Sequence, residues 1–208
     1  MKILKHQLIN KYLNYKYTFF FLSFLLLIFF PLLSLNTGIS GDEELHYSQS
    51  EKVINYLESW GKDKSALDTP KTHLKYYGQL FDNITTIIIK WLNIEDIYRF
   101  RHIANSIAGW GAIFLSGLLA AFLAGYRTGL LTLVFFLISS RFIGHSWNNL
   151  KDIPFALGYI ATIYLLFLFI KKLPKISLKL SLCTPFKAFS THVISISPCF
   201  FWNCSVSQ

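Results

Sequence analysis

The chain has 208 residues, of which 53% are hydrophobic, with 20 phenylalanines and a mean hydropathy of +0.41. This composition excludes an ordinary soluble domain and predicts an integral membrane protein. The net charge is +9, but the basic residues are dispersed along the chain rather than gathered on one element, so we expect no nucleic-acid partner.

Four apolar runs predict an all-α, polytopic fold with about four membrane spans, since a spanning helix needs about 20 largely apolar residues. The runs cover residues 17–35, 103–126, 128–144 and 153–170. Pro31 is expected to kink the first run, and Arg141 must reach towards the membrane surface if the third run is to cross. A cleaved signal peptide is the alternative for the first run, but that run is longer than the usual ~7–15 residues and no A-x-A site follows.

Basic residues beside these runs predict the orientation of the chain. Lysines precede the first run, Arg127 separates the second and third, and Lys171 and Lys172 follow the fourth. Short loops rich in Lys and Arg stay on the cytoplasmic side. We therefore expect a cytoplasmic N-terminus in a bacterial inner (plasma) membrane, with residues 36–102 and a short loop at 145–152 outside.

The long outer loop, residues 36–102, is predicted to carry amphipathic helices on the membrane surface. Apolar residues keep helical spacing from Glu43 to Trp60, and Thr69-Pro70 is expected to open a second helix that continues through Phe81. The apolar stretch 84–92 is expected to lie in the membrane interface as well.

The acidic stretch Gly41-Asp42-Glu43-Glu44 follows directly after the first span. Local physics accounts for it in one way, because Ser40-x-x-Glu43 fits a capping box and acids suit the first turn of a helix. A functional interpretation is also open. A carboxylate fixed at the membrane surface can act as a general base for an acceptor that arrives from outside.

Small residues recur four apart along the second span, in two neighbouring rows. The rows are Ala112, Ser116, Ala120 and Ala124, and Gly117, Ala121 and Gly125. Small side chains let helix backbones approach closely, so this helix is expected to pack against other helices.

The short outer loop reads His145-Ser-Trp-Asn-Asn-Leu-Lys-Asp-Ile-Pro154. An ordinary polar turn before a helix that starts at Pro154 is one interpretation. The other is a site, because ionisable groups near a hydrocarbon core are costly unless they are paired or used. Lys151 and Arg141 would then bind a phosphate, and Asp152 with Glu43 or Glu44 would hold a divalent cation through oxygen ligands.

Several of these features together resemble the start of the GT-C glycosyltransferases, specifically family 39, the bacterial relatives of protein O-mannosyltransferases. The features are the acidic pair after the first span, Tyr76-Tyr77-Gly78-Gln79-Leu80 late in the long loop, Arg101 before the second span, and Asn149-Leu-Lys-Asp-Ile-Pro-Phe-Ala156. The resemblance covers roughly residues 15–172.

This resemblance implies inverting transfer of a sugar from a polyprenyl-phosphate carrier to a lipid, glycan or protein acceptor on the non-cytoplasmic face. It implies Asp42 as the catalytic base and Glu43 as its neighbouring acid. It implies Arg101, Arg141 and Lys151 as the residues that neutralise the carrier phosphate. No cofactor other than the divalent cation is expected.

The family's members are longer than this chain, so we expect residues 1–174 to be the N-terminal part of such an enzyme, weak or inactive alone. Residues 175–208 contain no Asp or Glu, and we expect either a frameshifted tail or a short basic C-terminus without regular order. Two other functions stay open: a small polytopic binding or accessory subunit, and a transporter fragment, which ranks last because the sequence has no inverted repeat of broken helices.

Overall fold

The protein is described by a computed structural model that covers residues 2–69 and 73–172, with side chains from residue 13 onward. Within these ranges the chain forms helices and no strand, which confirms the all-α prediction. The α-helices are α1 (Lys2–Ser34), α2 (Glu43–Glu58), α3 (Leu80–Leu92), α4 (Ile97–Ala124), α5 (Tyr126–Ile138), α6 (Ser140–Asn148) and α7 (Asp152–Lys172), and a short 3-10 helix, η1, covers Leu74–Tyr76. The expected tail at 175–208 lies outside the described residues.

Three helices are long and apolar enough to cross a membrane, which identifies a polytopic membrane protein. They are the part of α1 from Leu13 to Ser34, the whole of α4 and the whole of α7. α1 runs through Pro31 and ends three residues later. A fourth span exists if α5 and α6 are taken together as one broken crossing.

The third predicted span is not one straight helix. α5 and α6 meet at Ser139 with a bend of 75°. Ser139 leaves helical geometry with a ψ of 90°, and its side chain accepts a hydrogen bond from the backbone N–H of Phe142 at 3.4 Å. Serine favours such a cap position because its hydroxyl satisfies a free N–H group of the new helix. The expected continuous helix over 128–144 is therefore wrong.

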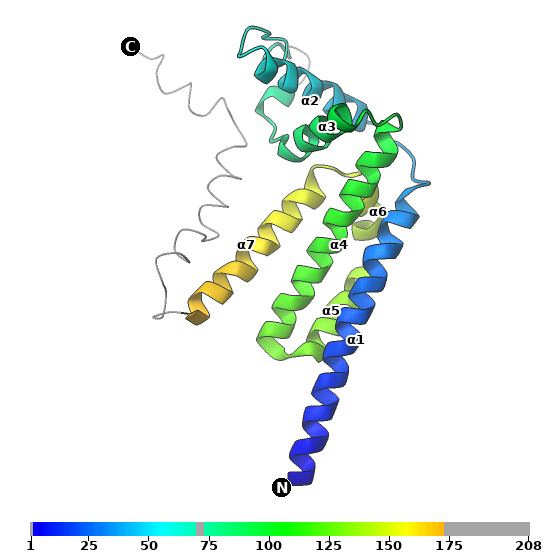
Figure 1. Cartoon of the computed structure of the whole chain (residues 1–208), viewed down its shortest axis with the longest axis vertical. Helices are drawn as coiled ribbons and strands as arrows, with labels where there is room; N and C mark the ends of the chain where they lie inside the picture. The colour runs from blue at the N-terminus through cyan, green and yellow to red at the C-terminus, as the bar shows by residue number, and fades with distance from the viewer. Residues whose placement is uncertain (1, 70–72, 173–208) are drawn as a thin grey trace.

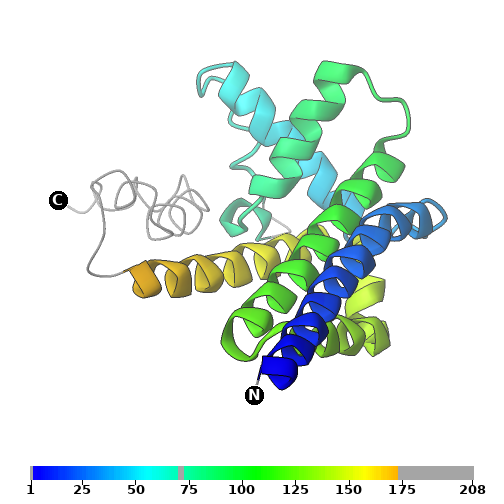
Figure 2. The same ribbon diagram turned by 60° about the horizontal axis from the view of Figure 1, so that its bottom comes forward.

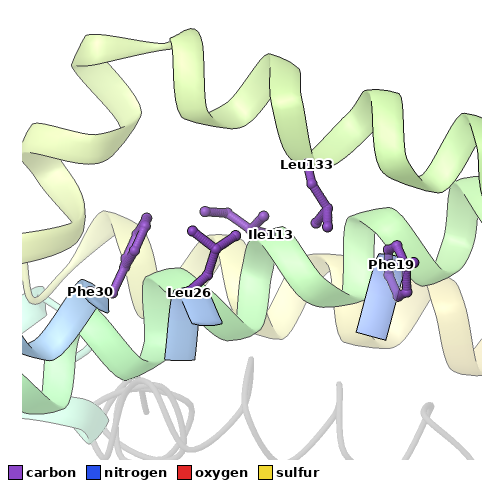
Figure 3. Packing of buried hydrophobic residues seen from close by; sticks show 5 residues of the cluster. All are labelled: Phe19, Leu26, Phe30, Ile113 and Leu133. Carbon is purple, nitrogen blue, oxygen red and sulfur yellow. The ribbon is translucent and has the colours of Figure 1, made fainter. Parts of the chain in front are cut away.

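α4 lies at the centre of the bundle, with α1, α5, α6 and α7 all packed on it (Figure 1). The buried apolar cluster joins α1, α4 and α5 through Phe19, Leu26, Phe30, Ile113 and Leu133 (Figure 3). These side chains close the space between the three helices over about three turns of α1.

Glycine sets the closest approaches between these helices. A side chain at Gly117 would lie 2.7 Å from the Phe19 ring, and one at Gly129 would lie 2.8 Å from the Gly117 carbonyl oxygen. Ala112 and Gly117 are both buried. The prediction that this helix packs against other helices is confirmed. Not every small residue takes part, since Ala124 is exposed and Gly125 has no neighbour within 4 Å.

α2 and α3 pack on each other and form an outer layer at one end of the bundle (Figures 1 and 2). The first predicted surface helix is confirmed as α2. The second is wrong as one continuous helix: Tyr77 adopts an extended conformation with a ψ of 142°, so η1 ends there and α3 begins only at Leu80. Pro70, its expected first residue, lies outside the described residues.

The buried face of α3 is largely polar, and its exposed face is apolar. It buries Asp82, Thr85 and Thr86 together with Ile89, and it exposes Ile84, Ile87 and Trp91, the last with 80% of its surface open. A helix on a water-soluble domain would turn these apolar residues inward. The position of residues 84–92 in the membrane interface stays a prediction, which this exposed apolar face favours.

Candidate functional site

The two outer loops meet in one cavity of about 360 Å³, between the outer layer and the ends of α4 and α7. The long loop and α4 contribute Ser40, Asp42, Glu43, His46, Asp82 and Arg101, and the short loop contributes His145, Asn148, Asn149, Leu150, Lys151 and Asp152. α1 ends, and α4 and α7 begin, at this end of the bundle (Figure 1). The predicted closeness of the acidic stretch to residues 148–152 is therefore present.

A buried ion cluster forms the floor of this site. The Arg101 guanidinium, fully buried, donates from Nη2 to Asp82 Oδ1 at 2.6 Å, and its Nε lies 3.9 Å from Glu43 Oε1. Its plane also faces the ring of Tyr47, 5.3 Å from the ring centre. Arg101 thus joins α4 to both helices of the outer layer. Charge-assisted hydrogen bonds of this kind are about twice as strong as neutral ones.

The second oxygen of Glu43 makes a separate contact with α4. Glu43 Oε2 lies 3.1 Å from His102 Nε2, and the other ring nitrogen, Nδ1, lies 2.9 Å from Thr37 Oγ1. His102 and Glu43 are both buried, at 2% and 3% exposure. These contacts hold the start of α2 against the first turns of α4.

Asp42 and Glu43 have different surroundings although they are neighbours. Glu43 is the first residue of α2, and its Oε2 also accepts from the Ser40 backbone N–H at 3.3 Å, which is one half of the expected capping box. Asp42 is the cap residue itself, makes no side-chain capping bond and is exposed. The pair therefore consists of one buried, paired carboxylate and one open to solvent.

Asn149 organises the short loop. Its Oδ1 accepts from the backbone N–H groups of Asp152 at 2.9 Å and Lys151 at 3.3 Å. Its Nδ2 lies within hydrogen-bond distance of Asp152 Oδ2, at 2.9 Å, and of His145 Nδ1, at 3.2 Å. Asparagine favours such turns because its short amide reaches the backbone two and three residues ahead. The loop is thus a well-bonded turn into α7, as one of the two interpretations expected, but α7 begins at Asp152 and not at Pro154.

Two contacts fix this turn against the rest of the site. The Asn105 side chain donates to the His145 carbonyl oxygen at 3.0 Å. The Lys151 ammonium lies 3.9 Å from the centre of the Tyr77 ring, close enough for a cation–π interaction. Lys151 remains exposed while holding the two outer loops together.

Burial changes the acidity of two groups of the outer layer. It raises the pKa of Tyr47 to about 12, and the hydrogen bond that the Tyr47 hydroxyl donates to Glu51 at 3.0 Å adds to the increase. Burial also raises the pKa of Asp82, an effect that the adjacent Arg101 guanidinium opposes. Tyr47 is therefore a neutral hydrogen-bond donor throughout the physiological range.

The cavity brings together five of the predicted site residues: Asp42, Glu43, Arg101, Lys151 and Asp152. Arg141 and Glu44 do not line it; both are exposed, Arg141 in the first turn of α6 and Glu44 in the first turn of α2. No group of three or more His, Cys, Asp or Glu side chains is arranged to hold a metal ion in residues 2–69 and 73–172. Asp152, the predicted metal ligand of the short loop, accepts a hydrogen bond from the Asn149 amide, and the metal stays a prediction.

Asp82 and His102 belong to the site although the sequence interpretation did not include them. Asp82, Thr85 and Thr86 recur three and four residues apart, a polar stripe that marks one face of α3. That stripe is readable from the sequence. Its pairing with Arg101, 19 residues away, depends on how α3 packs against α4.

Comparison with known proteins gives no match: no family model fits the chain, and no curated protein or solved structure is similar to it.

Proposed function

We propose that the chain is a membrane glycosyltransferase, or the N-terminal part of one, of the kind seen in family 39 of the GT-C enzymes. It would transfer a sugar from a polyprenyl-phosphate carrier to an acceptor, with inversion. One observation carries this proposal: an exposed carboxylate, Asp42, and an exposed ammonium, Lys151, line the same cavity at one end of a bundle of membrane-spanning helices.

The two exposed groups suit the two charges of such a reaction. The acceptor hydroxyl loses a proton as it attacks the anomeric carbon, and a fixed carboxylate can take that proton. The carrier leaves as a phosphate, which a cation stabilises. Asp42 is the proposed base and Lys151 the proposed partner of the phosphate. Arg101 also lines the cavity, and its Nη1 has no hydrogen-bond partner among the described residues, which supports a role towards the same phosphate.

The proposed orientation puts the cavity on the non-cytoplasmic side of a bacterial inner membrane. The N-terminus of α1, the start of α5, which contains Arg127, and the end of α7, which contains Lys171 and Lys172, lie at the end of the bundle away from the outer layer (Figure 1). Under the positive-inside tendency this end faces the cytoplasm. A lipid-linked sugar would then enter from the outer leaflet.

Sugar transfer by the Asp42→Asn variant tests the proposal. The full chain is reconstituted in liposomes with polyprenyl-phosphate-linked sugars, and release of free polyprenyl phosphate is measured. Loss of a general base typically lowers the rate by about 10²–10⁴-fold, while the exposed carboxylate contributes little to folding, so the amount of folded protein should be unchanged. Asp68→Asn, an exposed acid of the long loop outside the cavity, is the matched control.

Binding of the carrier provides a second measurement that does not need turnover. Polyprenyl phosphate should bind the full chain more tightly than the uncharged polyprenol, and Lys151→Ala should weaken binding of the phosphate about tenfold. Equal binding of the phosphate and the alcohol, together with unchanged transfer in Asp42→Asn, would contradict the proposal and favour the accessory-subunit alternative.

A further inference from the structure

The hydrogen-bond chain from Thr37 through His102 to Glu43 restricts where protons sit in the buried cluster. Each contact joins side chains that are buried or half-buried, so solvent does not supply alternative partners easily. A hydroxyl has one proton to donate, an ionised carboxylate has none, and a neutral imidazole has one. Counting these protons along the chain gives the state of the ring.

The hydroxyl proton of Thr37 is already used. Thr37 Oγ1 donates to the Ser34 carbonyl oxygen at 2.7 Å, a distance too short for two oxygens without a proton between them. Thr37 Oγ1 must then accept the hydrogen bond that joins it to His102 Nδ1 at 2.9 Å. Nδ1 therefore carries a proton.

The other nitrogen faces a carboxylate. Glu43 Oε2 accepts from the Ser40 backbone N–H at 3.3 Å, and Glu43 Oε1 lies 3.9 Å from Arg101 Nε, so both oxygens face N–H donors, as the oxygens of a carboxylate do. An ionised carboxylate can only accept, which requires a proton on His102 Nε2 as well, 3.1 Å away.

We infer that His102 is a buried imidazolium, a positioning residue that holds Glu43 ionised through an ion pair. The titratable groups around this pair are Asp82 from α3, Arg101 from α4 and His46 from α2. Arg101 lies between Glu43 and Asp82 and is shared by both, so the His102 imidazolium gives Glu43 a cation of its own. Buried charges are tolerated when they are paired and hydrogen-bonded in this way.

The two neighbouring acids, Asp42 and Glu43, therefore have different roles. Glu43 Oε2 is taken by His102 and Ser40, and Oε1 is buried beside Arg101, so Glu43 is not available to take a proton from a substrate. Asp42 is exposed and makes no capping bond. This assignment of the base to Asp42 rests on the proposed function; the protonation state of His102 does not.

Nitrogen NMR of the full chain, labelled with ¹⁵N-histidine in detergent micelles near neutral pH, tests the inference directly. The resonances of an imidazole distinguish a ring with two N–H groups from either neutral tautomer. We expect His102 to carry both protons. Glu43→Gln should remove one of them, because a neutral amide does not stabilise the positive charge of the ring. His102→Gln assigns the signal by its loss.

Variants of Thr37 provide the matched comparison. Thr37→Val removes the acceptor for the Nδ1 proton, so the His102 ring should become neutral, while Thr37→Ser should keep both protons. Thr18→Val, at an exposed position of α1, should leave the His102 signal unchanged. If Thr37→Val does not fold, the Thr37→Ser and wild-type spectra still decide the question.

A wild-type His102 ring with one proton, on either nitrogen, would overturn the inference. None of these measurements involves sugar transfer, so a failure here is distinct from a failure of the proposed function. Both protons on His102, together with equal binding of polyprenyl phosphate and polyprenol, would leave the buried ion pair established and remove only the glycosyltransferase proposal.

Discussion

The helix bundle and the outer layer of this protein are held together by opposite means. In the bundle, glycine contacts and an apolar cluster around Ile113 fix helices by shape (Figure 3). In the outer layer, α2 and α3 turn polar residues inward and expose Ile87 and Trp91. The difference follows from the side chains at each contact. Small residues let the helices of the bundle pack closely against one another. The outer layer buries polar and charged side chains, which hydrogen bonds and ion pairs hold together.

This comparison makes the ion cluster the most sensitive point of the outer layer. Arg101→Met should cost about 3–5 kcal/mol of unfolding free energy, because Glu43 and Asp82 would lose their shared guanidinium while staying buried. Unfolding by a denaturing detergent, followed by circular dichroism, measures the change. On the same helix, Arg99→Met removes a pair with Asp96 whose side chains are 58% and 55% exposed, and it should cost less than about 1 kcal/mol. Equal losses in both variants would show that burial of the cluster is unimportant.

The sequence predicted the composition of this cluster only in part, and the physical reason is clear at Arg101. Its place before a span pointed to a cation beside the outer loops, and it lies in the first turns of α4, where it lines the cavity between those loops. The sequence also put Glu43 at a helix start, and the capping contact with Ser40 confirms that local reason. Burial of Arg101 between two acids depends instead on Asp82 facing inward from α3, a long-range packing result that local spacing does not determine.

The bundle has a corresponding weak point where two backbones meet. Gly129→Ala should cost about 1–3 kcal/mol, because the new methyl group would lie 2.8 Å from the Gly117 carbonyl oxygen and force α4 and α5 apart. The same unfolding measurement applies. Gly158→Ala on α7 has no neighbour within 4 Å and should be neutral or slightly stabilising, since alanine favours helices. Destabilisation by both variants would mean that the close approach of α4 and α5 is not the cause.

The spans of the helix bundle were predictable from the sequence, but the break in one of them was not. Apolar length alone identified α1, α4 and α7 as spans. The break at Ser139 was missed because thirteen uncharged residues followed by Arg141 fit one helix or two equally well. The serine pair at 139–140 was the available signal, since serine caps a new helix more readily than it continues an old one.

A smaller effect tests the contact between the two outer helices. Thr86 Oγ1 lies 2.7 Å from Ser50 Oγ, and the Ser50 hydroxyl donates to the Tyr47 carbonyl oxygen, so Thr86 is the donor of the pair. Thr86→Val should cost about 1 kcal/mol, the net value of one buried hydrogen bond. Thr128→Val, which removes an exposed bond from α5 to the carbonyl oxygen of Ala124 at the end of α4, should change unfolding by less. If hydrogen exchange of α2 is unaltered in Thr86→Val, this pair does not hold the layer together.

The order of the cluster's members along the chain has a consequence for biosynthesis. Glu43 and Asp82 both precede Arg101 in the sequence, so each of the two acids leaves the ribosome before the arginine does. Chains are made and begin to fold from the N-terminus. When α4 is inserted, the two acids that neutralise Arg101 have therefore already been made. In a rearranged gene that encoded α4 first, the Arg101 guanidinium would reach the membrane before its counter-ions.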